Sequence, residues 1–73
     1  MITHIPVTKV DDIAVNTLES KDNSIICRYG KLDMCSNLYI GYVESKDRTK
    51  IKKHCIVAET LLDIEKYINS LTE

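Results

Sequence analysis

Five basic side chains gather in residues 46–54, with a single acidic residue, Asp47, among them. Tyr39 and Tyr42 stand shortly before this segment. Lysine and arginine neutralise phosphates, and aromatic rings stack on unpaired bases, so these residue types suit contact with nucleic acid. A lysine-rich hairpin also serves to keep an edge strand from pairing with a neighbour. The candidate partner or nucleic-acid contacts are Lys46, Arg48, Lys50, Lys52, His54 and Tyr39.

Charge is distributed unevenly along the chain. Residues 46–54 carry a local charge of plus four, whereas residues 10–22 and 59–73 each carry minus three, and the whole chain carries minus one. A dedicated nucleic-acid binder usually has an excess of basic charge over the whole domain. Separated acidic and basic surfaces instead steer a charged protein partner into register. We therefore rank protein binding first and nucleic-acid binding second.

The residues that hold zinc in proteins are present but poorly spaced for it. The candidate ligands are Cys27, Cys35, His54 and Cys55. They include no Cys-x-x-Cys pair, and the neighbours His54 and Cys55 point to opposite faces of a strand. Three cysteines, an odd number, also suit buried thiols in a reducing compartment better than a disulfide framework. We expect no metal ion and no other cofactor.

Catalysis has little support in the sequence. His54 and Cys55 could form a base and nucleophile pair only if their side chains met, which adjacent strand residues do not allow. The two glycines, Gly30 and Gly41, are isolated, so there is no glycine-rich phosphate loop, and no His-Glu-x-x-His motif occurs. A chain of 73 residues also has little room for a substrate pocket. We expect a protein without enzyme activity.

The element that the sequence predicts most clearly is a C-terminal helix over residues 60–71. Thr60 and Asp63 have the spacing of a capping box at its start. The apolar residues that follow recur at spacings of three, four and three, which gives one apolar stripe. The stripe consists of Leu61, Ile64, Ile68 and Leu71.

Residues 37–44 and 50–57 are predicted to form a β-hairpin with a tight loop at 46–49. The predicted register pairs Leu38 with Val57 and Ile40 with Cys55, so that apolar residues meet on one face. The opposite face, which carries Tyr39 and Ile56, is mixed and partly polar. We expect the helix to cover the first of these faces.

A near-repeat organises the rest of the chain. Leu-Glu-Ser-Lys-Asp at 18–22 and Val-Glu-Ser-Lys-Asp at 43–47 each lie between apolar stretches, as hairpin loops do. Residues 24–30 are strand-like in their β-branched and aromatic content. Residues 10–20 fit either a helix or a strand, and the repeated loop favours a strand. Pro6 limits the N-terminal residues to an edge strand.

Together these elements make one small α+β domain, residues 1–73. We expect an antiparallel sheet of three to four strands with the C-terminal helix packed on one face. A chain this short buries only about 60% of its unfolded surface, so a second copy could bind along strand 24–30 or at the mixed face. No apolar run reaches the roughly 18 residues that cross a bilayer, and the N-terminus lacks a signal sequence. We therefore expect a cytoplasmic protein with no membrane partner.

These observations lead to one functional hypothesis and one alternative. The hypothesis is a non-enzymatic intracellular protein-binding module, a small inhibitor or regulator that occupies the surface of a partner. The alternative is a nucleic-acid-binding protein that uses the basic hairpin 46–54. The chain has eight lysines and two arginines, a ratio that fits an AT-rich genome such as that of a phage or mobile element. The hypothesis therefore includes an accessory protein of a phage or mobile element.

Overall fold

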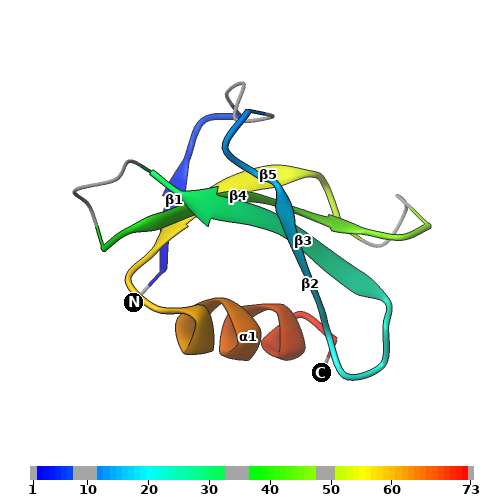
Figure 1. Ribbon diagram of the computed structural model, residues 1–73. Coiled ribbons are helices and arrows are strands. Elements are labelled where there is room, and N and C mark those ends of the chain that lie inside the picture. Colours follow the sequence, from blue (N-terminus) through cyan, green and yellow to red (C-terminus); the bar gives the residue numbers. More distant parts are fainter. Residues whose placement is uncertain (1, 8–11, 33–36, 48–50, 73) are drawn as a thin grey trace.

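The computed structural model describes residues 2–7, 12–32, 37–47 and 51–72, which form a five-stranded antiparallel sheet with one helix across it (Figure 1). The elements are β1 (Ile2–Ile5), β2 (Asn16–Glu19), β3 (Ile25–Lys31), β4 (Tyr39–Ser45), β5 (His54–Ala58) and α1 (Leu61–Ser70). The spatial order is β1-β5-β4-β3-β2. The α+β class is confirmed. The sheet has five strands rather than three or four, because both β1 and β2 pair as edge strands.

The near-repeat marks the ends of two strands, and each copy contains a buried serine. Ser20 follows β2 and Ser45 ends β4, and both are exposed by 2% or less. The Ser20 hydroxyl accepts a hydrogen bond from the Ile25 amide at 3.1 Å, and the Ser45 hydroxyl accepts one from the Ile51 amide at 3.5 Å. Each serine thus satisfies an amide of the returning chain, which closes the loop.

The β4–β5 hairpin forms, with its register displaced by two residues from the predicted one. Ile40 lies opposite Val57, and Tyr42 lies opposite Cys55. An even displacement leaves every side chain on its predicted face, because strand side chains alternate with a period of two. The connection is longer than the predicted loop at 46–49, because β5 begins only at His54.

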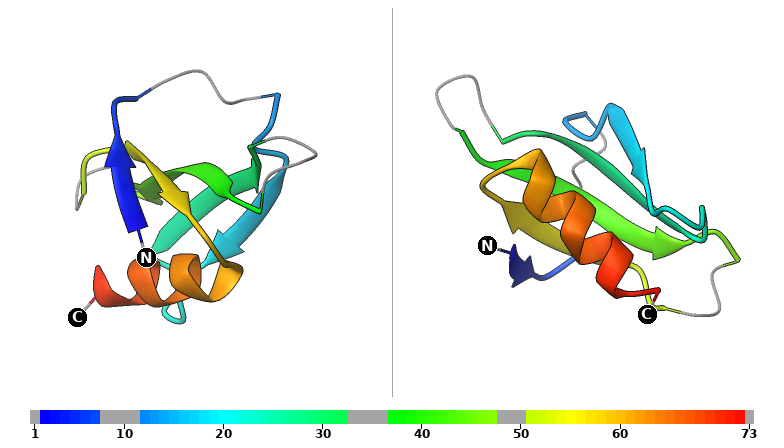
Figure 2. Two further views of the ribbon diagram at one scale, coloured as in Figure 1. Left: turned by 90° about the vertical axis from the view of Figure 1, so that its left-hand side faces the viewer. Right: turned by 90° about the horizontal axis from the view of Figure 1, so that it is seen from below.

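Helix α1 packs on the sheet face that was predicted to stay mixed and partly polar, so the predicted helix face is wrong. We name this the helix-covered face, and Figure 2 shows α1 running obliquely across it. The buried residues of the helix are Ile64 and Ile68, whereas Leu61, which was predicted in the same apolar stripe, is 41% exposed. The core that they complete consists of Ile25, Cys27, Val43, Ile56 and Ala58. Within the described residues, no helix has the length and apolar character that crossing a membrane requires.

The other face, which we name the open face, is partly covered by residues 12–15. Ala14 is 1% exposed there, and the residues buried with it are Ile40, Tyr42 and Cys55. Gly30 allows this close approach, since a Cβ atom at that position would lie 1.8 Å from the Ile13 carbonyl oxygen. This short segment therefore takes the place on the open face that we predicted for the helix.

Thr60 caps α1 as predicted. Its backbone is extended, and its hydroxyl oxygen accepts a hydrogen bond from the Asp63 amide at 3.1 Å. Replacing Thr60 by alanine removes this acceptor, so we expect the free energy of unfolding to fall by about 1 kcal/mol in urea denaturation. Thr60→Ser keeps the hydroxyl and should stay within about 0.5 kcal/mol of the wild type. Equal stability of the alanine variant and the wild type would contradict the capping role.

Candidate cationic groove

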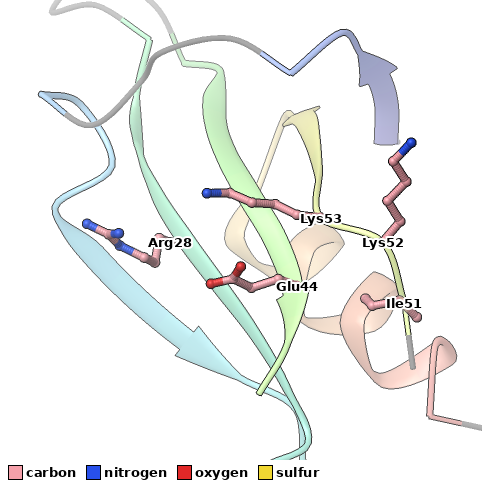
Figure 3. Close-up of a pocket in the computed structure, with 5 residues that line it drawn as sticks. All are labelled: Arg28, Glu44, Ile51, Lys52 and Lys53. Atoms are coloured by element: carbon pink, nitrogen blue, oxygen red, sulfur yellow. The ribbon is translucent and has the colours of Figure 1, made fainter. Parts of the chain in front are cut away.

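The open face carries a groove of about 380 Å³, shown in Figure 3, which we name the cationic groove. Its lining brings together one residue of β3, one of β4 and three consecutive residues of the β4–β5 connection. These residues are Arg28, Glu44, Ile51, Lys52 and Lys53. Three cations against one carboxylate give the groove a positive charge, in a chain whose net charge is minus one.

The sheet register positions the charged groups. On β3 and β4, Ile26 lies opposite Glu44, and Arg28 lies opposite Tyr42. Arg28 and Glu44 are therefore diagonal neighbours on the open face, within reach of long side chains. In Figure 3, the side chains of Glu44 and Lys53 extend toward the side where Arg28 lies, the Arg28 guanidinium group points away from both toward β2, and Lys52 extends in another direction. The groove is thus bordered by Arg28 on one side and by Lys52 on the other, with Glu44 and Lys53 between them.

Lys53 is held in place by an aromatic ring. Its Nζ atom lies 4.2 Å from the centroid of the Tyr42 ring. A cation over the face of an aromatic ring is attracted by the ring quadrupole, which restricts the lysine side chain. Tyr42 is itself 5% exposed, so its ring supports Lys53 and is not available to stack on a base.

The structure divides the predicted contact residues between the two faces of the sheet. Lys52 lines the cationic groove, whereas Tyr39 and His54 lie on the helix-covered face. The Tyr39 ring is half-buried and meets the Tyr29 ring edge-on, with centroids 6.0 Å apart. Residues 51–53 precede β5 and are not part of a strand, so strand alternation does not fix the direction of the Lys52 side chain.

Of the remaining three contact residues, Lys46 and Arg48 were predicted in the loop at 46–49, and Lys50 was predicted at the start of the strand 50–57. The Lys46 Nζ atom forms an ion pair with a Glu19 carboxylate oxygen at 2.8 Å, which ties the end of β4 to the edge strand β2. Arg48 and Lys50 lie outside the described residues.

Arg28 and Glu44 were not among the predicted site residues. Both are remote in sequence from the basic segment 46–54, and only the pairing of β3 with β4 brings them to the groove. The sequence did hold one indication for Arg28. It is the only charged residue in the predicted strand 24–30, and its side chain would point to one face of that strand. A charged residue in an otherwise apolar strand indicates that this face is accessible to water.

The two described cysteines are buried on opposite faces. Cys27 belongs to the core under α1, and Cys55 belongs to the small core of the open face. Burial raises the pKa of Cys27 to about 12, which keeps it as an unreactive thiol. Cys35 lies outside the described residues. Among the residues that the structure describes, no three His, Cys, Asp or Glu side chains gather around a common point.

The chemistry available in the cationic groove is the binding of anions. An arginine guanidinium binds a carboxylate or a phosphate through two parallel hydrogen bonds, and lysine adds a point charge. No protein-family model, curated protein or solved structure matches this chain. The cationic groove is therefore the feature on which a function can be proposed.

Proposed function

We propose that this protein is a non-enzymatic binding module that holds an acidic segment of a partner protein in the cationic groove. The supporting observation is that three cations, Arg28, Lys52 and Lys53, line one groove. Carboxylates of the partner would pair with these cations. A module of this kind would act as an inhibitor or regulator by occupying the surface of its partner.

Two features of the groove favour a protein over a nucleic acid. Glu44 places a carboxylate among the cations, and this carboxylate would repel a continuous phosphate chain. All four tyrosines lie in the described part of the chain, and none is among the residues that line the groove. Stacking on aromatic rings supplies about 1–3 kcal/mol per base in the binding of single strands, and the groove offers no ring for it.

Nucleic-acid binding is the alternative proposal, through the same cations together with the basic hairpin 46–54. The three cations of the groove support it, since lysine and arginine contacts to phosphate supply much of the affinity for a nucleic acid. The two proposals differ in the probe that should bind and in the effect of salt. Phosphate contacts lose affinity steeply as the salt concentration rises.

The test is a fluorescence-anisotropy titration with a labelled peptide rich in Asp and Glu, with single-stranded DNA and with RNA, at low and moderate salt. We expect the acidic peptide to bind, and Arg28→Glu or Lys53→Glu to weaken this binding by at least about tenfold, because each replaces an attraction by a repulsion. The control is Lys66→Glu, the same change at an exposed position of α1, which should alter the affinity by less than about twofold.

The other outcomes contradict the proposal in different ways. If the oligonucleotides bind, the acidic peptide does not, and Arg28→Glu weakens oligonucleotide binding, the groove is a nucleic-acid site. If neither probe binds at low salt, or if Arg28→Glu and Lys66→Glu have equal effects, the groove is not the binding surface. Circular dichroism of each variant establishes that the fold is retained.

The surfaces that we predicted for a second copy are both covered within the chain. Strand β3 lies between β2 and β4, so it is not an edge of the sheet. Ile56, on the face that was predicted to be mixed, is 1% exposed and packs in the core with α1. A homodimer is therefore proposed only through the sheet edges that the described residues leave free, β1 and β2.

A further inference from the structure

Side chains from three elements meet around a single oxygen atom on the helix-covered face. The Tyr67 hydroxyl oxygen of α1 lies 2.7 Å from His54 Nε2 of β5 and 3.1 Å from His4 Nε2 of β1. The three rings meet edge to face, with centroids between 5.5 and 5.9 Å apart. Two imidazole nitrogens and one phenol oxygen thus converge, although the residues are up to 63 positions apart in sequence.

Strand pairing places the two histidines side by side. His4 lies opposite Ile56 on β5, so His4 and His54 are diagonal neighbours on one face. Tyr67 is half-buried beside them. Because β1, β5 and α1 each contribute one donor, the cluster is formed only in the folded chain.

A backbone carbonyl orients His54. Its Nδ1 atom lies 2.8 Å from the Lys52 carbonyl oxygen, which has no hydrogen to donate, so Nδ1 must carry the proton. In the neutral ring, the Nε2 lone pair is then directed at the Tyr67 hydroxyl. Histidines that bind metal ions usually donate their other ring N–H to a carbonyl or carboxylate in this way. The cluster thus has a feature of a metal site besides the convergence of its donors.

We propose that His4, His54 and Tyr67 bind a divalent transition-metal ion of the zinc type through the two Nε2 atoms and the phenolate oxygen. The ion would replace the phenolic proton of Tyr67, which is released to solvent. Because the Tyr67 hydroxyl donates its proton to His54, His4 Nε2 must donate to the Tyr67 oxygen. On binding the ion, His4 would therefore take the tautomer that carries its proton on Nδ1. Water would complete the coordination. Imidazole nitrogen suits zinc, copper and nickel.

Two of the three donor separations in the cluster are close to those around such an ion. Zinc bonds to nitrogen and oxygen are about 2.0–2.2 Å long, so two ligands on a tetrahedral ion lie about 3.4 Å apart. The donor separations of 2.7 and 3.1 Å therefore need to widen by less than about 1 Å. His4 is exposed and His54 is half-buried, so an ion and its water ligands can reach the donors from solvent.

The surroundings of the cluster also permit a cation. Lys53, which immediately precedes His54, places its ammonium group over the Tyr42 ring on the open face. The cluster lies on the opposite side of the sheet from the cationic groove, so this proposal does not depend on the proposed function.

The test is isothermal titration calorimetry of the full chain with zinc chloride. The parent protein for this test carries Cys35→Ser, because a further thiol could bind zinc. We expect one Zn²⁺ ion per chain. Loss of an outer-shell partner alone typically costs about 10–100-fold in metal affinity, so His4→Gln and Tyr67→Phe should each weaken binding by more than about tenfold. Thr3→Ala, at a neighbouring exposed position of β1, is the control and should bind zinc as the parent does.

Nuclear magnetic resonance locates the ion without relying on the variants. Zinc should shift the imidazole signals of His4 and His54 in the parent protein. In a separate thermal melt, zinc should raise the melting temperature of the parent but not that of His4→Gln. Unchanged zinc affinity in both His4→Gln and Tyr67→Phe would refute the proposal. The proposal would also be refuted if no saturable binding is seen up to about 1 mM zinc, a concentration that corresponds to a binding free energy of about −4 kcal/mol.

Discussion

Replacing Ile68 by alanine should lower the free energy of unfolding by about 2–5 kcal/mol. The side chain is 0% exposed and lies in the core between α1 and the sheet. Its removal forfeits the transfer free energy of the lost methyl groups and leaves a cavity that the short helix can close only partly. A chain of 73 residues has a total stability of about 4–11 kcal/mol, so this one change removes a large part of it.

Urea denaturation followed by circular dichroism measures this loss. Leu62→Ala is the matched control, because Leu62 is on the same helix and is 55% exposed. We expect its stability to stay within about 0.5 kcal/mol of the wild type. If the two variants lose the same free energy, the assignment of the buried helix face is wrong.

A double-mutant cycle establishes which sheet face the helix covers. Ile68→Val and Ile56→Val alter the same core, so their effects should be coupled by about 0.5 kcal/mol or more. Ile40 belongs to the separate core of the open face, so Ile40→Val should combine with Ile68→Val additively within about 0.5 kcal/mol. If Ile68→Val is coupled to Ile40→Val and not to Ile56→Val, the helix covers the sheet face that the sequence predicted.

Local signals predicted the elements well. The Thr60 cap and the spacing of Ile64 and Ile68 depend on neighbours within a few residues, so they gave the start and the buried residues of α1. The β4–β5 hairpin also formed, and its register error of two residues preserved the face of each side chain. Period and capping are properties of the local chain, which is why they could be identified from sequence.

The helix face could not be predicted in the same way. Both faces of the hairpin carry apolar residues. The face with Gly41 and His54 was predicted to be partly polar, although in the structure it forms the core under α1. His54 is accommodated there because Tyr67, 13 residues later, supplies a hydrogen-bond partner. The open face is partly covered by residues 12–15, in a segment that fitted both a helix and a strand. The choice of face therefore depended on contacts that no local pattern contains.

The two candidate sites were only partly predictable for a related reason. Lys52 was identified because it belongs to a visible run of basic residues. Arg28 joins it only through the register of β3 with β4, and His4 meets His54 only through the pairing of β1 with β5. Sites assembled across several strands require the strand order, and the pairing of the first strand with the last is the least local contact in this sheet.

Gly30→Ala tests the part of the fold that the sequence did not predict. The added Cβ atom would lie 1.8 Å from the Ile13 carbonyl oxygen and 2.7 Å from the Ile13 carbonyl carbon. Both are backbone atoms, and the same oxygen already accepts a hydrogen bond from the Val15 amide at 2.8 Å. A rotamer change cannot relieve this contact, so residues 12–15 must move away from the sheet.

The expected loss from Gly30→Ala is about 2 kcal/mol. Alanine restricts the unfolded chain and so contributes about 0.4–1 kcal/mol in favour of folding, but overpacking that shifts backbone costs about 1–3 kcal/mol, and a contact this short places Gly30 at the upper end of that range. No described glycine has a positive φ, so the requirement at Gly30 comes from close approach. Lys31→Ala, at the next and exposed position of β3, should stay within about 0.5 kcal/mol of the wild type. If Gly30→Ala unfolds at the same urea concentration as Lys31→Ala, residues 12–15 do not pack on the open face, and the small core around Ile40 and Cys55 needs another cover.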